Sequence, residues 1–194
     1  MKNIKVVLLL LVITGISNST HAQKSIKCLI DTSLGEIEIE LYQDKAPITV
    51  QNFLQYVDSA TYNNSSFFRT CTKENEVDRE IKIQVIQGGT IPKKTVRAPI
   101  KIETTAITKI LHKNGTISMA RSEPDSATSS FFICINDQPE LDFGGKRNPD
   151  GQGFAAFGEV TKGMDIVLKI QSQKNKNQQL LEPIQIHAIT RVTN

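Results

Sequence analysis

The sequence predicts a mainly β domain with two helices, on the basis of three observations. Residues 26–41 alternate apolar and polar side chains in two runs separated by a turn-forming segment, which is the pattern of a hairpin with one solvated face. Residues 47–57 and 164–168 instead have apolar side chains at helical spacing. Residues 184–192 alternate again, so the order of elements fits a barrel whose last strand pairs with its first.

The first hairpin is predicted from alternation on both sides of the turn at residues 31–35. Glutamates occupy positions 36, 38 and 40, which indicates a solvated acidic face on the second strand. The apolar residues between these polar positions predict the opposite, buried face, and they are Ile26, Cys28, Ile30, Ile37, Ile39 and Leu41.

The two helices are predicted from apolar residues three and four positions apart. The first has Pro47 in its first turn, where proline is tolerated, and its apolar face consists of Val50, Phe53, Leu54 and Val57. The second follows Gly163 and has Met164, Val167 and Leu168 at helical spacing. The final strand has Ile184, Ile186, Ala188, Thr190 and Val192 at every second position.

Residues 1–22 have the pattern of a secretory signal peptide. Lys2 and Lys5 precede an apolar run over residues 6–16. A polar stretch follows it and ends with the small residue Ala22, just before Gln23. That run is shorter than the ~20 residues that cross a bilayer, although a retained N-terminal anchor remains the alternative. We therefore expect cleavage near Ala22, export to the periplasm or medium, and one domain over residues 23–194 without stable membrane insertion.

The charge of this domain excludes several classes of partner and cofactor. The leader contains two of the 23 basic residues and none of the 20 acidic ones, so the rest of the chain is nearly neutral and shows no electrostatic footprint for nucleic acid. His112 and His187 lack cysteine or histidine partners at metal-ligand spacing, and no phosphate-binding loop is present. We expect a monomer without metal or cofactor.

The three cysteines leave at least one thiol unpaired. Cys28 and Cys134 lie in apolar, strand-like runs and are predicted to be buried thiols, with a disulfide between them as the alternative. Cys71 lies in a polar stretch and is predicted to be the exposed thiol.

Several short motifs, each of them a weak signal alone, become significant because of the order in which they occur. The chain has Phe67 and Arg69, then IQGG at residues 86–89, GTISMA at 115–120, Ser129 with FFI at 131–133, and FGEV at 157–160. In this order the motifs resemble the cyclophilin family of peptidyl-prolyl isomerases, from about Ile26 to the C-terminus. The resemblance implies a closed, eight-stranded antiparallel β-barrel capped by two α-helices.

The resemblance also implies a site and a substrate, namely proline-containing peptides and unfolded protein clients. Arg69 matches the catalytic arginine of the family, and Gln87 matches the glutamine that helps hold substrate and arginine. A guanidinium is a rigid, permanently charged donor, which suits stabilisation of a twisted prolyl amide. The expected substrate-binding residues are Phe68, Ile83, Val85, Ala120, Arg121, Ser130, Phe132, Leu141 and Phe154.

Departures from the family pattern leave a second function open. Phe68 replaces the usual histidine, Ser130 replaces a glutamine, and Glu140 stands where many members have an aromatic residue. A peptide-binding module or holdase with decayed chemistry is therefore the alternative to an isomerase that assists folding of exported proteins. Arg69 and Gln87 are 18 positions apart, more than in the family motif, so the charged segment 71–82 is predicted to be an exposed loop near the groove.

Overall fold

A computed structural model of the protein describes residues 25–192, and the predicted leader lies outside this range. The described chain is rich in strands, with short helices between them. Its elements are β1 (Ser25–Thr32), β2 (Gly35–Tyr42), α1 (Pro47–Asp58), β3 (Ser65–Cys71), β4 (Val85–Gly88), α2 (Thr105–Thr108), β5 (Thr116–Met119), β6 (Phe131–Cys134), β7 (Ala155–Lys162), α3 (Met164–Gln171), β8 (Asn175–Lys176) and β9 (Gln179–Arg191), with 3-10 turns at Lys93–Thr95 and Pro139–Leu141.

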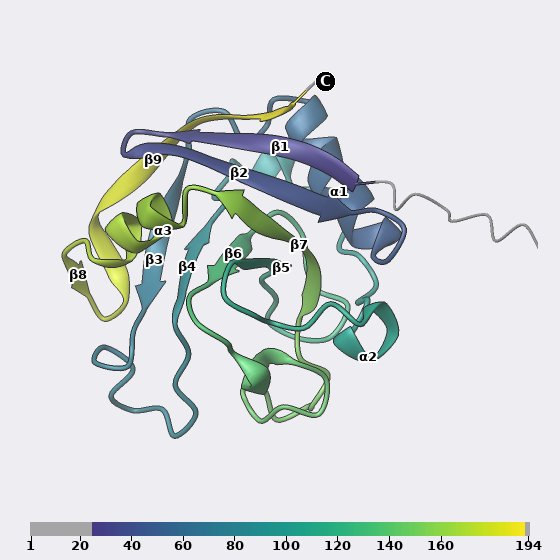
Figure 1. Ribbon diagram of the computed structural model, residues 1–194, viewed down its shortest axis with the longest axis vertical. Helices are drawn as coiled ribbons and strands as arrows, with labels where there is room; N and C mark the ends of the chain where they lie inside the picture. The colour runs from purple at the N-terminus through teal and green to yellow at the C-terminus, as the bar shows by residue number, and fades with distance from the viewer. Residues whose placement is uncertain (1–24, 193–194) are drawn as a thin grey trace, which may run out of the picture.

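Eight of these strands form a closed antiparallel barrel. The hydrogen-bonded order is β1-β2-β7-β5-β6-β4-β3-β9, and β9 also pairs with β1, which closes the ring. β8 has two residues and pairs only with β9, as a small hairpin beside the barrel (Figure 1). The closed eight-stranded barrel implied by the resemblance is therefore confirmed.

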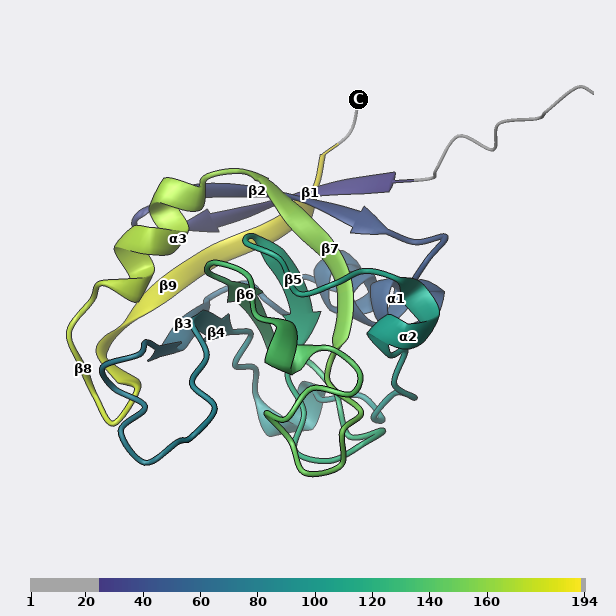
Figure 2. The ribbon, with the colours of Figure 1, turned by 60° about the horizontal axis from the view of Figure 1, so that its bottom comes forward.

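Both predicted helices are present and cover different parts of the barrel. α1 packs against β2, β7 and β9, whereas α3 packs against β2, β3 and β4 (Figures 1 and 2). All four predicted apolar residues of α1 are buried. In α3 the buried residues are Ile166, Val167 and Ile170, and Leu168 is exposed. The four-residue α2 was not predicted, because one turn is too short to show helical periodicity.

The final strand departs from strict alternation at one point. Its register against β1 shifts between Asp31 and Thr32, so His187 is skipped in the pairing. Ile184 and Ile186 face the core as predicted, but beyond the shift the buried residue is Ile189 instead of Ala188 or Thr190. A bulge of this kind reverses which residues face inward, and sequence alternation alone does not reveal it.

The barrel interior is filled by aliphatic side chains and a cluster of aromatic rings. Phe131 on β6 makes edge-to-face contacts with Phe53, Tyr62 and Phe67, at ring-centroid distances of 5.5, 5.7 and 5.8 Å. Buried Tyr62 donates its hydroxyl proton to the carbonyl of Ser129, so the ring brings no unpaired polar group into the core. These contacts join α1 and the turn that follows it to β3 and β6.

A second, smaller apolar cluster lies on the outer face of the same strands. It contains Cys71, Ile83, Val85, Phe132, Cys134, Leu141 and Phe154. Along β6, Phe131 and Ile133 belong to the interior cluster and Phe132 and Cys134 to the outer one, as period-two alternation requires. The prediction that the two adjacent phenylalanines face different surfaces is confirmed.

All three cysteines are free and buried, which corrects the prediction for Cys71. Its polar neighbours suggested exposure, but the alternation of β3 places the thiol in the outer cluster. Cys71 and Cys134 both lie opposite Val85, on either side of β4, so their Cα atoms are about 9 to 10 Å apart. That separation exceeds disulfide reach, and Cys28 belongs to the interior cluster, so no pair of cysteines is placed to form a disulfide.

We predict that the native thiols react slowly with a thiol reagent. Burial raises the pKa of Cys71 to about 11 and that of Cys28 to about 12, so below these values both remain protonated and poorly nucleophilic. At pH 8 the folded protein should label slowly, whereas the urea-unfolded chain should label rapidly at all three positions. Mass spectrometry identifies the labelled sites, and rapid native labelling of Cys71 would contradict its buried position.

Candidate active site

A β-bulge on β3 determines which side chains reach the outer face. Phe67 pairs with Gly88 and Arg69 with Gln87, so two residues of β3 advance for one of β4. Without the bulge, Phe67 and Arg69 would point to the same side, because side chains two positions apart share a face. The extra residue, Phe68, lets Phe67 fill the barrel core while Arg69 points outward.

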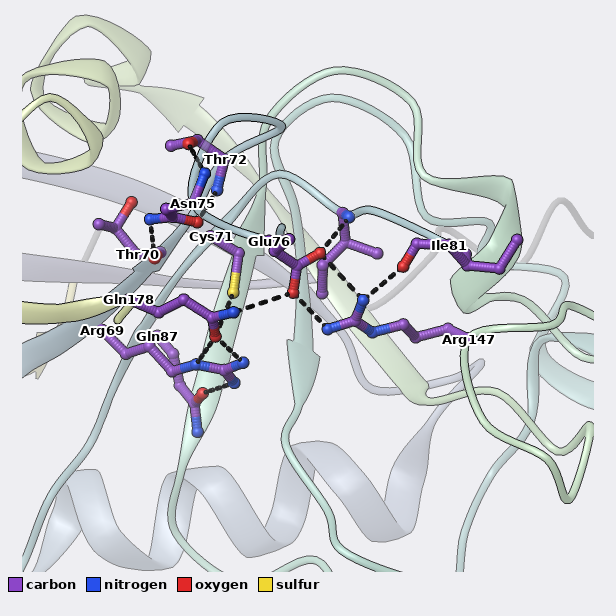
Figure 3. A network of polar contacts seen from close by, with 11 residues as sticks. Arg69, Thr70, Cys71, Thr72, Asn75, Glu76, Ile81, Gln87, Arg147 and Gln178 are labelled. Atoms are coloured by element: carbon purple, nitrogen blue, oxygen red, sulfur yellow. Dashed lines mark hydrogen bonds and ion pairs between the residues drawn. The ribbon is translucent and has the colours of Figure 1, made fainter. Parts of the chain in front are cut away.

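The guanidinium of Arg69 is held from two sides by amide oxygens (Figure 3). Its Nη1 donates to Oε1 of Gln87 at 2.9 Å, and its Nε donates to Oε1 of Gln178 at 2.9 Å. Nη2 donates to the same Gln178 oxygen. Neither partner is charged, so the positive charge of Arg69 is not neutralised by a carboxylate in direct contact.

Arg69 and Gln87 line a cavity of about 200 Å³ on the outer face of β3, β4 and β6. Its floor is apolar and includes Phe132 and Phe154, whose rings meet edge to face at 5.3 Å. Val85, Leu141 and Ala120 complete this floor, and four arginines line the cavity as well: Arg69, Arg79, Arg121 and Arg147. A small apolar pocket beside cationic donors suits a ring such as that of proline, flanked by peptide carbonyl groups.

Arg121 fixes one wall of the cavity. Its guanidinium donates to both carboxylate oxygens of Asp150 at 2.8 Å and to the carbonyl of Gly153 at 2.7 Å, and lies over the Phe154 ring at 5.1 Å. Gly153 has φ +64°, and a Cβ there would lie 2.4 Å from the carbonyl oxygen of Leu141, so only glycine fits. The Arg121 guanidinium lowers the pKa of the Asp150 carboxyl, which keeps this pair charged near neutral pH.

His112 supports the floor from below. The ring is 1% exposed and stacks on Phe132, with 5.9 Å between centroids and 15° between planes. Its Nδ1 lies 2.7 Å from Oδ1 of Asp142 and its Nε2 lies 3.0 Å from the hydroxyl of Ser118. Both ring nitrogens therefore have partners. Among residues 25–192 no group of metal-ligating side chains gathers that could hold an ion.

The structure brings most of the predicted site residues together. Those that line the cavity are Arg69, Gln87, Ile83, Val85, Ala120, Arg121, Phe132, Leu141 and Phe154. Phe68 is the half-buried bulge residue, and Ser130 contributes its backbone carbonyl to a hydrogen bond with the N–H of Ala120, so neither side chain is among those lining the cavity. The carboxylate of Glu140 accepts a hydrogen bond from the N–H of Lys146 and so holds its own loop.

Several residues of the site were not predicted. Arg79, Arg147 and Asn148 also line the cavity, and Gln178 contacts Arg69 from the turn between β8 and β9. Arg147 and Gln178 lie 78 and 109 positions from Arg69 in sequence, so local patterns could not associate them with it. Residues 144–151, which include Arg147 and Asn148, are rich in turn-forming side chains, and this pattern indicates a loop without specifying its role.

The segment after β3 is only partly the exposed loop that was predicted. Six of its seven charged side chains are exposed, but Glu76 is 1% exposed. Its carboxylate is paired with both terminal nitrogens of Arg147 and accepts the N–H of Ile83 at 2.7 Å. The charge was expected to prevent burial, and a charged partner 71 positions away is what permits it.

Comparison with known proteins identifies the family. The model for the cyclophilin type peptidyl-prolyl cis-trans isomerase family matches residues 27–191. The chain belongs to this cyclophilin family. A peptidyl-prolyl cis-trans isomerase from Acinetobacter baylyi is 41% identical over 165 residues, which cover 82% of this chain and 79% of that protein. Isomerase B from Escherichia coli is 39% identical over 145 residues, covering 72% and 80%.

Solved cyclophilins share the fold. A cyclophilin type isomerase from Cryptosporidium parvum superposes with a TM-score of 0.71 at 22% identity, covering 88% of this chain and 99% of that one. A second structure of that protein, determined in the presence of the dipeptide Ala-Pro, gives a TM-score of 0.69 at 23% identity. Family and relatives together establish a peptidyl-prolyl cis-trans isomerase, which confirms the enzyme over the binding module.

We predict that His112→Leu destabilises this cyclophilin, because the buried His112 ring supports the cavity floor from below. The change removes the partner of Ser118 and one partner of Asp142, and leaving such groups unpaired costs about 1–3 kcal/mol. Urea denaturation measures the loss of unfolding free energy. His187→Leu is the matched control because His187 is exposed, and an equal loss in both variants would argue against a specific role for the buried ring.

Proposed function

We propose that this cyclophilin isomerises prolyl bonds of exported proteins by stabilising the twisted amide with Arg69. The observation on which the proposal depends is the placement of a fixed guanidinium at the edge of an apolar cavity. Rotation about a peptide bond is slow because amide resonance opposes it by about 18–20 kcal/mol. A catalyst must therefore bind the twisted amide better than either planar form.

The hydrogen bonds of Arg69 leave donors for this task. A guanidinium has five N–H groups, and Nε, Nη1 and Nη2 each use one on Gln87 or Gln178. One N–H on each terminal nitrogen is left to meet a substrate. When the prolyl C–N bond twists, resonance is lost and the nitrogen gains a lone pair, which an N–H of Arg69 stabilises by donation. The planar amide offers no such acceptor, so the interaction favours the transition state.

Gln87 and the apolar floor position the substrate for that contact. The Nε2 group of Gln87 has no hydrogen-bond partner among the described residues, so it is free to donate to a peptide carbonyl. The proline ring enters between Phe132, Leu141 and Phe154, where it is removed from water. Ile83 and Val85 line the same cavity and add to its apolar surface.

Arg69→Ala should lower the catalytic rate by about 10²–10³ while the barrel remains folded, by analogy with removal of a preorganised donor. Arg69→Lys should recover little, because a point charge cannot reproduce the two-sided fork geometry. A protease-coupled assay on a proline peptide measures turnover, with and without EDTA, which should have no effect. Arg191→Ala is the control, since Arg191 pairs with Asp58 at the surface. Full activity in folded Arg69→Ala would show that this mechanism is wrong.

Clients of an exported isomerase are proline-containing chains that fold outside the cytoplasm. The sequence of residues 1–22 supports export, and in the part of the chain that the structure covers no helix is long and apolar enough to cross a membrane.

We predict that the protein isolated from its native cell begins at or near Gln23. Signal peptidase cleaves after small residues such as Ala22, and the short apolar run before it does not favour retention as a span. Intact-mass analysis of the soluble and membrane fractions determines at which residue the mature chain begins. A full-length chain in the membrane fraction would mean that the leader is retained as an anchor, and client assignment would have to change with it.

A further inference from the structure

The turn between β8 and β9 has an unusual residue at the point where it meets the active site. Lys176 pairs with Gln179, so Asn177 and Gln178 form a two-residue hairpin turn, with φ of +50° and +71°. Turns with two positive φ angles favour asparagine first and glycine second, because a side chain at the second position is strained. Gln178 thus occupies a place where glycine would fold more easily.

The side chain of Gln178 accounts for this conflict. Its Oε1 accepts hydrogen bonds from Nε and Nη2 of Arg69, and its backbone carbonyl accepts the N–H of Thr70 on β3. The turn is thereby fixed beside the guanidinium, opposite Gln87 (Figure 3). Glycine would keep the turn and lose the contact with Arg69.

Glu76 determines which way the Gln178 amide points. Nε2 of Gln178 lies 3.5 Å from Oε1 of Glu76, while Oε1 of Gln178 faces Arg69. A carboxylate only accepts hydrogen bonds and a guanidinium only donates them, so an amide between the two has one favourable orientation. The flipped amide would place its NH₂ against the guanidinium and its oxygen against the carboxylate.

Glu76 is itself held in place by the loop on the far side of the cavity. Arg147 donates to both its carboxylate oxygens and to the carbonyl of Ile81, and the side chains of the Glu76–Arg147 pair are 0% and 8% exposed. A buried carboxylate requires such a partner. The resulting chain of contacts runs Arg147, Glu76, Gln178, Arg69, Gln87, and joins three segments far apart in sequence (Figure 3).

We propose that Gln178 is a positioning residue for the isomerase reaction and that Glu76 sets its orientation. With Gln87 on one side alone, the guanidinium of Arg69 could rotate away from the cavity. Gln178 removes that freedom without neutralising the charge, as a carboxylate at the same place would. The segment 72–84 between β3 and β4 therefore acts on the position of Arg69 through Glu76, in addition to lining the cavity with Arg79 and Ile83. This inference rests on the proposed role of Arg69.

The test compares Gln178→Gly with Asn177→Gly, its neighbour in the same turn. Both changes remove the strain that a side chain causes at a positive φ angle. Both proteins should therefore melt at the same temperature as wild type or higher. The side-chain hydrogen bonds of Arg69 within the described chain go to Gln87 and Gln178, so the Asn177 variant should retain full activity. Gln178→Gly should lose roughly 10- to 100-fold in catalytic rate, because small displacements of a catalytic group are costly. Its affinity for a proline peptide, measured by equilibrium titration, should change less than twofold.

The role of Glu76 is tested by coupling. Glu76→Gln should lower the rate severalfold in the wild-type background and have no further effect in Gln178→Gly, since the two act as one unit. Glu80→Gln, an exposed change in the same segment, is the control. If Glu76→Gln does not fold, the pair Glu76→Leu with Arg147→Met replaces it, because removing both buried charges leaves neither uncompensated.

The outcomes separate this inference from the proposed function. Full activity of folded Gln178→Gly, or additive effects of the Glu76 and Gln178 changes, would overturn the positioning roles. If Arg69→Ala is inactive in the same experiment, the mechanism nevertheless stands. If Arg69→Ala is fully active, the mechanism fails and the positioning inference fails with it. If the melting temperature of Gln178→Gly fell so far that the variant was unfolded at the assay temperature, its loss of activity would be due to unfolding, and the residue would be merely structural.

Discussion

The candidate active site depends on the β-bulge at Phe68. β3 contributes both an aromatic ring to the barrel core and a guanidinium to the outer face within three residues, Phe67 to Arg69. If β3 alternated strictly, Phe67 and Arg69 would point to the same face, and only one of these two roles could be filled. The bulge places one unpaired residue between them, so the core is filled and Arg69 still lies opposite Gln87 on β4.

The same strands build both clusters, so stability and chemistry are coupled through shared backbone. On β6, Phe131 holds the interior aromatic cluster together while Phe132, the next residue, forms the cavity floor. On β4, Ile86 is a core residue and Gln87 a site residue. The cavity floor is therefore built on the same strands as the barrel wall.

The sequence predicted the elements that have a locally repeating pattern of apolar and polar residues. Alternation located the first hairpin, helical spacing located α1 and α3, and motif order located Arg69, Gln87 and the apolar floor. What it missed depends on register or on distant partners. The bulge near His187 changes the inward face of β9, the pairing of β3 buries Cys71 in the outer apolar cluster, and Arg147 permits the burial of Glu76. Local composition reports none of these.

Three of the places where local preference and structure disagree surround Arg69. Phe68 interrupts a strand ladder, Glu76 is a buried charge, and Gln178 occupies a turn position that favours glycine. Similar departures occur elsewhere in the described chain, such as Lys109 with a φ of +61° and the buried Glu103, whereas glycine is kept at tight approaches such as Gly153. A protein selected for stability alone would remove such conflicts, because each costs free energy. The three departures near Arg69 each contribute to its surroundings: the bulge turns Arg69 outward, Gln178 accepts its hydrogen bonds, and Glu76 contacts the Gln178 amide.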